Sequence, residues 1–123
     1  MNIRSMQRLD HAHPELRRLM LEAAKRCPVD FEISEVRRSK QRQQQLVDAG
    51  ASQTLRSRHL TGHAADIYCT VDGKLRWDWP LYARAAVHIK SVAASLGIKI
   101  VWGGDWRTLR DGPHYELDRR AYP

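Results

Sequence analysis

The sequence predicts an α+β fold, with a small, largely antiparallel sheet and about three helices. Residues 14–26 and 80–96 carry apolar side chains at helical spacing. Residues 29–36 instead alternate apolar and polar side chains, as a strand with one buried face does. Helices and strands follow one another without a regular strand–helix–strand rhythm, which disfavours a parallel sheet. A length of 123 residues fits one domain covering residues 1–123.

The first expected helix begins at Pro14, since proline suits the first helical turn, and is stopped by Pro28. One face of this helix is apolar and consists of Leu16, Leu19, Met20, Ala23 and Cys27. In the strand that follows, Val29, Phe31 and Ile33 share the apolar face.

The second and third expected helices differ in character. Residues 39–49 are polar, and only Leu46 and Val47 are expected to face a core. Residues 80–96 form the clearest helix, and Gly97 closes it. Its apolar stripe consists of Leu81, Ala85, Ile89, Val92 and Leu96.

The rest of the chain predicts a loop and three further strands. Residues 51–62 are expected to form the loop, and residues 63–69 suit a strand that ends in a turn at 71–74. Residues 98–102 and 113–117 complete the expected sheet.

Composition narrows the function classes. No apolar run approaches the ~20 residues of a membrane helix, and the N-terminus lacks the apolar centre of a secretory signal. We therefore expect a soluble chain made in the cytoplasm, monomeric and without stable membrane insertion. Cys27 and Cys69 match no disulfide or zinc pattern and are expected to be small apolar side chains. The formal charge of +7 fits either an anionic partner or a solvated surface, and no nucleic-acid-binding signature accompanies it.

The stretch SRHLTGHAAD, residues 57–66, raises the question of a metal site. His59 and Asp66 are separated by a turn at Gly62, so both side chains could face one point. His114 in the later DGPHYEL offers a third ligand, and Asp111 lies three residues before it. Three ligands with a nearby carboxylate are the minimum for metal-assisted hydrolysis.

A competing set of ligands pairs His59 with His63 at helical spacing, as in the HExxH zinc motif. Leu60 stands where that motif needs glutamate, and Gly62 is poor helix material. We therefore expect His63 not to bind the metal. Surface or capping roles are expected for the remaining histidines, His11, His13 and His88.

Two motifs carry a family resemblance. SRHLTGHAADI resembles the S-x-H-x-x-G-x-A-x-D signature of the zinc D-alanyl-D-alanine carboxypeptidase-like peptidases, and DGPHYEL resembles their second signature. VWGGDW and the upstream RRSKQRQQQLVDAGAS are typical of the bacteriophage endolysin branch, the L-alanyl-D-glutamate peptidases. The resemblance covers residues 29–123 and implies a hedgehog/D-Ala-D-Ala peptidase-like fold.

The resemblance also implies roles for individual residues. His59, Asp66 and His114 match the zinc ligands, and Asp111 matches the general base. The arginine that polarises the scissile carbonyl aligns best with Arg38, because Ser39 follows it and Gln43 lies five residues beyond. The adjacent Arg37 is the alternative, and we expect its side chain to be a surface charge.

Four further residues have two interpretations each. Ser57 and Glu116 can fix the ligand histidines by hydrogen bonds, or be ordinary polar residues of a loop and a strand. Trp102 and Trp106 can line a substrate cleft or pack in the core.

The resemblance implies a zinc-dependent endolysin that hydrolyses the stem peptide of peptidoglycan at the L-alanyl-D-glutamate bond. We expect such an enzyme to reach the wall after release, through a holin. The alternative is a D-alanyl-D-alanine carboxypeptidase, for which an export signal would be expected. A non-catalytic wall-binding relative and a basic nucleic-acid binder are weaker alternatives, because the ligands and Asp111 are all present.

Overall fold

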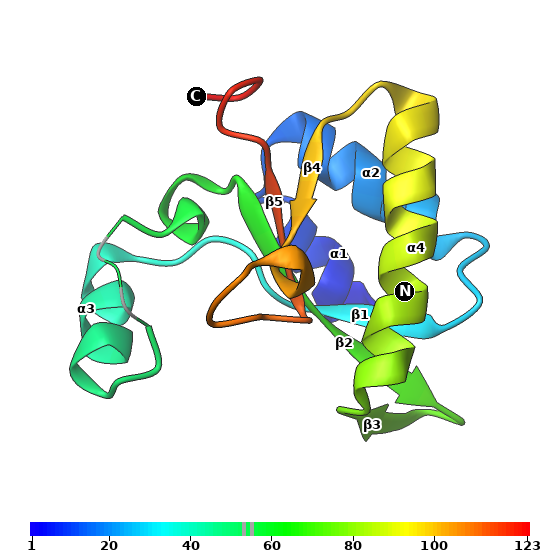
Figure 1. Cartoon of the computed structure of the whole chain (residues 1–123), viewed down its shortest axis with the longest axis horizontal. Helices are drawn as coiled ribbons and strands as arrows, with labels where there is room; N and C mark the ends of the chain where they lie inside the picture. Colours follow the sequence, from blue (N-terminus) through cyan, green and yellow to red (C-terminus); the bar gives the residue numbers. More distant parts are fainter. Residues whose placement is uncertain (53, 55) are drawn as a thin grey trace.

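A computed structural model describes residues 1–52, 54 and 56–123 of the chain. Its centre is an antiparallel sheet in the order β1-β2-β5-β4, with β3 pairing with the outer part of β2 (Figure 1). The strands are β1 (Asp30–Glu35), β2 (Ala64–Val71), β3 (Lys74–Arg76), β4 (Ile100–Trp102) and β5 (His114–Leu117). The α+β class with a small antiparallel sheet is therefore confirmed.

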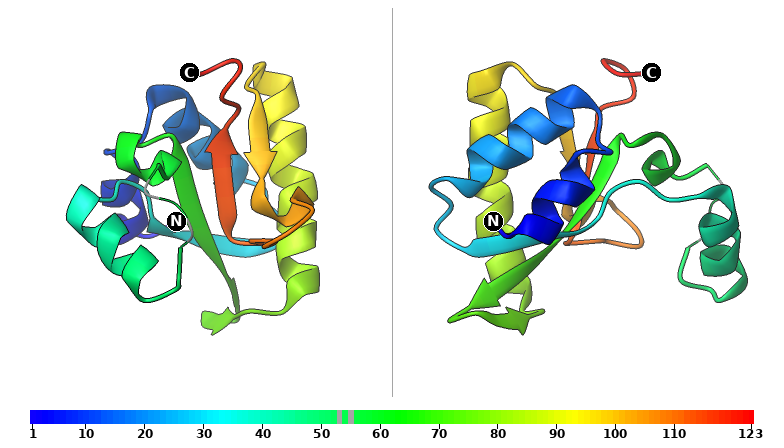
Figure 2. Two further views of the ribbon diagram at one scale, coloured as in Figure 1. Left: turned by 60° about the vertical axis from the view of Figure 1, so that its left-hand side comes forward. Right: turned by 180° about the vertical axis from the view of Figure 1, so that it is seen from behind.

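The α-helices of the described residues are α1 (Ile3–Leu9), α2 (Pro14–Ala24), α3 (Lys40–Asp48) and α4 (Trp79–Leu96). Helices α1, α2 and α4 cover one face of the sheet, whereas α3 stands apart beyond its other side (Figures 1 and 2). No helix among the described residues is both long and apolar enough to cross a bilayer.

The core lies between the sheet and these three helices. Strand alternation sends Ala65, Ile67, Tyr115 and Leu117 into it, and all four are fully buried. The helices contribute a fully buried apolar set that consists of Leu9, Leu16, Leu19, Met20, Ala23, Ala85 and Ile89. The intervening residues of β2 and β5 face the opposite side of the sheet, where the polar site lies.

Several sequence expectations need correction. Helix α1 was not predicted, because it buries only Ser5 and Leu9 and so shows no apolar stripe. With α1, the described residues contain four α-helices, beside the three that the sequence predicted individually. Strand β3 was also missed, because its side chains are all exposed and lack the alternation of a half-buried strand. In α3, Gln43 is the buried residue, and the expected Leu46 and Val47 are only half-buried.

The expected loop at residues 51–62 contains a short 3-10 helix, η1 (Arg58–Thr61), and residues 53 and 55 of that loop lie outside the described residues. A second 3-10 turn, η2 (Gly103–Asp105), follows β4. Of the cysteines, Cys69 is buried and Cys27 is half-buried, and both are free thiols.

Candidate metal centre

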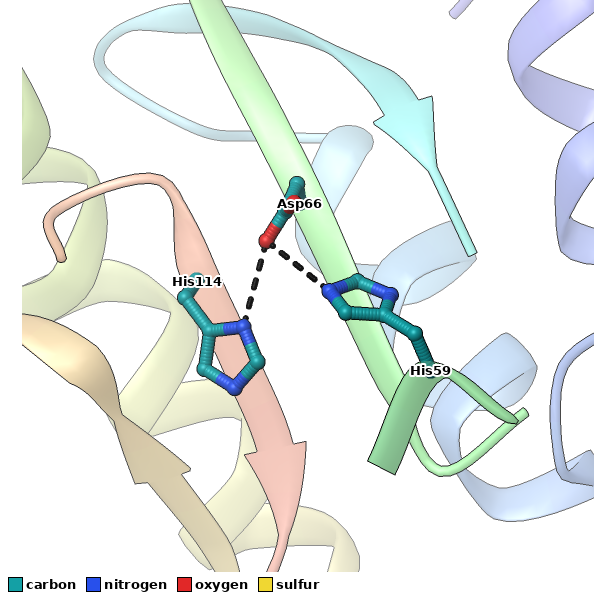
Figure 3. A group of neighbouring side chains, drawn as sticks. All are labelled: His59, Asp66 and His114. Atoms are coloured by element: carbon teal, nitrogen blue, oxygen red, sulfur yellow. Dashed lines mark hydrogen bonds and ion pairs between the residues drawn. The ribbon is translucent and has the colours of Figure 1, made fainter. Parts of the chain in front are cut away.

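Three side chains from three elements meet on the polar side of the sheet. His59 comes from η1, Asp66 from β2 and His114 from β5, and one ligand atom of each lies within 4.8 Å of the others (Figure 3). Asp66 and His114 are direct partners in the β2–β5 ladder, so strand pairing itself brings them together. Asp66 Oδ1 lies 3.3 Å from His59 Nε2 and 3.2 Å from His114 Nδ1.

The local fold of η1 aims His59 at this point. Ser57 caps the turn, since its hydroxyl accepts a hydrogen bond from the His59 backbone N–H at 3.2 Å. Gly62 ends the turn with a φ of 74°, a left-handed conformation that glycine adopts without strain. The buried Nδ1 of His59 donates to the Val36 carbonyl at 2.7 Å, because a carbonyl can only accept. This bond assigns a ring hydrogen to Nδ1 and leaves Nε2 as the nitrogen that faces Asp66.

This His59 Nε2 is also the test of whether the site fits a metal ion. It is buried and has no hydrogen-bond partner among the described residues, although buried polar atoms nearly always have one. A ring nitrogen with a free lone pair, facing a carboxylate and a second histidine, is the arrangement that a divalent cation would satisfy. The three residues therefore fit a metal ion.

His114 is oriented by a carboxylate on its far side. Its Nε2 donates to Glu116 Oε1 at 2.9 Å, which leaves Nδ1 on the side of Asp66. Metal-binding histidines commonly donate their second ring nitrogen to a carboxylate or carbonyl in this way. Glu116 is therefore hydrogen-bonded to the ring of His114. Ser57 is hydrogen-bonded to the backbone of His59, and the Val36 carbonyl is hydrogen-bonded to the ring of His59.

The groups of the cluster shift the pKa values of Asp66 and His114 away from their usual ranges. Burial alone would raise the pKa of Asp66, but the neighbouring His114 and His59 outweigh burial and hold this pKa well below its usual range. Burial alone would lower the pKa of His114, but its hydrogen bonds to Asp66 and Glu116 outweigh burial and raise the pKa to about 9. Asp66 is therefore a carboxylate at neutral pH, and the raised pKa of His114 favours a proton on that ring beside it.

Asp111 and Arg38 line the same cavity as the cluster. Burial raises the pKa of Asp111, and the Asp66 carboxylate raises it further, which makes Asp111 a better proton acceptor than an exposed aspartate. The Arg38 guanidinium pairs with Glu35, donates from Nη1 to Gln43 Oε1 at 2.7 Å and places Nη2 3.9 Å from Asp66 Oδ2. Arg37 is exposed and does not line this cavity.

The cavity has a volume of about 470 Å³, enough for a short peptide segment. Trp106 lies at its wall, with its ring centroid 5.1 Å from that of His114, whereas Trp102 is buried in the core. Trp106 thus lines the cavity, as one interpretation expected, and Trp102 packs in the core, as the other expected. Around the cluster, the wall is completed by a ring of polar and small apolar residues, namely Leu46, Ala51, Ser52, Thr54, Arg58, Leu109 and Arg119.

The other histidines lie elsewhere. His63 Nδ1 contacts Thr61 Oγ1 at 2.7 Å, and its ring packs 5.1 Å from that of His13. His13 caps α2 by accepting from the Glu15 N–H, and His88 Nε2 donates to the Ala23 carbonyl. His63 therefore does not join the cluster of His59, Asp66 and His114.

Sequence reasoning missed three parts of the site. The Val36 carbonyl has no residue-specific signal, because any residue could supply it. Glu35 was the acidic end of an alternating strand and received no role, although it pairs with Arg38. Gln43 was used only to align Arg38, and its burial and bond to Arg38 were not foreseen.

Comparison with known proteins shows which family the chain matches. The chain matches the family described as phage L-alanyl-D-glutamate peptidase over residues 1–122. It is 36% identical over 105 residues to the L-alanyl-D-glutamate peptidase of Listeria phage A118, and this match covers 85% of the chain. The chain spans only 36% of that relative's length.

A second relative is similar over nearly its whole length. The L-alanyl-D-glutamate peptidase of Escherichia phage T5 is 30% identical over 122 residues, covering 96% of this chain and 88% of the relative. The crystal structure of the Serratia marcescens L-Ala D-Glu endopeptidase ChiX superposes with a TM-score of 0.95 at 46% identity, covering all of this chain and 92% of that one. The chain therefore belongs to the phage L-alanyl-D-glutamate peptidase family.

Proposed function

We propose that this protein is a zinc-dependent endolysin that hydrolyses the L-alanyl-D-glutamate bond in the peptide stem of peptidoglycan. The observation that carries the proposal is the meeting of His59, Asp66 and His114 in one cavity with Asp111 and Arg38. The names of the relatives specify the L-alanyl-D-glutamate bond, which supports the choice of substrate.

The metal in this proposal is zinc, held by His59 Nε2, Asp66 and His114 Nδ1. Two imidazoles and one carboxylate are a ligand set that catalytic zinc sites use, with a further position left for substrate or water. When bound, the ion supplies Lewis-acid chemistry at the reacting carbonyl. The Val36 carbonyl and Glu116 fix both imidazoles in the orientation that binding requires.

The remaining steps belong to the side chains of the chain itself. The Asp111 carboxylate accepts a proton from the attacking water, which its raised pKa favours, and returns that proton to the leaving amine. The Arg38 guanidinium stabilises the negative charge that develops on the carbonyl oxygen. Glu35 and Gln43 hold the guanidinium, so it needs little reorganisation when that charge develops.

The proposal includes where the enzyme works. We propose that the enzyme acts on the host wall after release from the cytoplasm and that a holin provides the passage. The net charge of +7 supports association with an anionic wall. One chain supplies all the residues of the site, which supports a monomer as the active form.

The test is digestion of purified peptidoglycan by the zinc-loaded protein, with and without excess chelator. The proposal expects new L-alanine carboxyl termini and new D-glutamate amino termini, identified by mass spectrometry, and their loss on chelation and return with zinc. Release of free D-alanine would establish the carboxypeptidase alternative instead. Absence of any new terminus would contradict catalysis on this substrate.

A further inference from the structure

The VWGGDW segment runs directly behind the loop that carries Asp111, and its first tryptophan makes a specific contact with that loop. Trp102 ends β4 and is 8% exposed, and its Nε1–H donates to the Gly112 carbonyl at 2.7 Å. A buried indole N–H needs a hydrogen-bond acceptor. Here the acceptor is the backbone carbonyl of the residue that follows Asp111. The single polar atom of the Trp102 side chain is therefore committed to the loop between Asp111 and His114.

The backbone of Gly103 holds the same loop from the other side. The Asp111 N–H donates to the Gly103 carbonyl at 3.0 Å, and the His114 N–H donates to the Asp111 carbonyl at 3.2 Å. A Cβ on Gly103 would lie 2.4 Å from the Asp111 carbonyl oxygen and 3.1 Å from the His114 Cβ. No side chain fits in that space, so residue 103 approaches the loop as backbone.

Two aromatic contacts fix the indole in turn. The Trp79 ring lies 5.6 Å from that of Trp102, and its edge would be 3.2 Å from a Cβ on Gly112. The Lys90 ammonium lies over the Trp102 ring at 5.2 Å. The indole is thus held between neighbours, and its hydrogen bond has one available direction.

From these contacts we infer that Trp102 is a positioning residue, which fixes the Asp111 carboxylate relative to the cluster of His59, Asp66 and His114. The inference rests on the proposed function, in which Asp111 accepts the proton. Asp111 and His114 are three residues apart, and β5 holds only His114. The Gly103 carbonyl and the Ile67 N–H hold the loop at Asp111 and Pro113, and the hydrogen bond from Trp102 adds an attachment at Gly112, between them.

The consequence is a loss of turnover when this attachment is removed. General-base catalysis requires the carboxylate within hydrogen-bond reach of the proton it takes. A displacement of about 1 Å can cost ~10²-fold in rate, even when the change is remote from the reacting atoms. Zinc binding should persist, because the ligands are held by other contacts, from Val36 and Glu116.

The experiment compares two replacements of Trp102 with one control. Trp102→Phe removes the N–H donor, and benzothienylalanine at position 102 removes it while keeping the size of the ring. Trp77→Phe is the control, because Trp77 is 62% exposed and stacks on Tyr82 outside the cavity. We expect kcat to fall about 10- to 100-fold in both Trp102 variants, with KM and zinc content unchanged, and no change in Trp77→Phe.

A crystal structure of the zinc-loaded benzothienylalanine variant supplies the direct readout, and we expect the Asp111 carboxylate to be displaced from its wild-type position. Wild-type turnover in both Trp102 variants would overturn the inference, and so would an undisplaced Asp111 or loss of zinc. A wild-type protein without activity would contradict the proposed function instead, and the position of Asp111 in the variant would still decide this inference.

Discussion

At the scale of single residues, hydrogen bonds to the rings of His59 and His114 decide which nitrogen of each ring faces the centre of the site. The Val36 carbonyl and Glu116 each accept a hydrogen bond from one ring nitrogen of His59 or His114 and leave the other nitrogen facing Asp66. Asp111 and Arg38 line the same cavity without belonging to that group of three. Ligand and catalytic roles can therefore be separated by substitution.

Replacement of Asp111 tests the base. Asp111→Asn keeps the size of the side chain but removes the carboxylate that accepts the proton in the proposed function. We expect turnover to fall by on the order of 10²-fold or more, with full zinc content, since general-base assistance is typically worth this much. The measurement is the rate of terminus release alongside metal analysis. Loss of zinc would show that Asp111 is a ligand, and unchanged turnover would show that it is structural.

Replacement of Arg38 tests the oxyanion partner, with Arg37 as its matched neighbour. Arg38→Ala should lower kcat about 10²- to 10³-fold while zinc is retained, because such a donor acts mainly in the transition state. Arg38→Lys should restore part of the loss, since an ammonium cannot reproduce the planar guanidinium. Arg37 is exposed, so Arg37→Ala should stay near wild type. The reverse pattern would assign the role to Arg37.

At the scale of elements, α3 differs from the other helices. It stands away from the sheet (Figure 1), and its buried side chain is the polar Gln43. Gln43 accepts from Arg38 Nη1, and its amide donates to Ser52 Oγ at 2.8 Å and to the Thr54 carbonyl. This helix is therefore attached to the site by a buried hydrogen-bond network rather than by apolar burial.

A single substitution should release this attachment. Gln43→Ala removes the hydrogen bonds that join α3 to Arg38, Ser52 and the Thr54 carbonyl, so we expect faster hydrogen exchange in α3 and lower turnover. Gln44→Ala is the control, because the exposed Gln44 side chain donates to Asp48 within the same helix rather than to the site. Hydrogen-exchange mass spectrometry of both variants gives the comparison. Equal protection of α3 in the two would refute the role of Gln43.

At the scale of the whole molecule, metal binding should be coupled to stability, because the proposed ligands come from η1, β2 and β5. An ion at 1,000 times its Kd stabilises the folded state by about 4 kcal/mol, which corresponds to a Tm increase on the order of 10 °C for a domain of this size. Differential scanning calorimetry with and without chelator measures the shift.

Variants identify the origin of that metal-dependent shift. We expect it to vanish in His59→Ala, Asp66→Ala and His114→Ala and to persist in His63→Ala, whose ring lies beside His13. A shift retained in His59→Ala but lost in His63→Ala would place the metal at His63 instead of in the cluster of His59, Asp66 and His114.

Stability should also decline in alkaline solution. Burial raises the pKa of the Cys69 thiol from 9.0 to about 12, so above pH 9 the unfolded chain releases a proton that the folded chain keeps. The resulting stabilisation is complete below about pH 9 and is lost as the pH rises towards 12. Urea unfolding between pH 8 and 10 should show a falling free energy of unfolding, with a shallower slope in Cys69→Ala. An identical slope in that variant would contradict the assignment.

The sequence by itself determined the elements with strong apolar periodicity and the residues of the two motifs. Helix α4 and strands β1 and β5 follow from patterns that span a few neighbouring residues, and such patterns reflect one buried face. His59, Asp66 and His114 were nominated from spacing and resemblance, since each motif is a short run of neighbouring residues.

The tertiary structure decided what depends on contacts between distant segments. Pairing of β2 with β5 brings Asp66 to His114 across 48 residues, and no local pattern encodes that register. The burial of Gln43, the Val36 carbonyl on His59 and the Trp102 bond to Gly112 likewise join separate segments. Helix α1 and strand β3 escaped prediction for the same reason, because packing partners rather than their own side-chain patterns stabilise them.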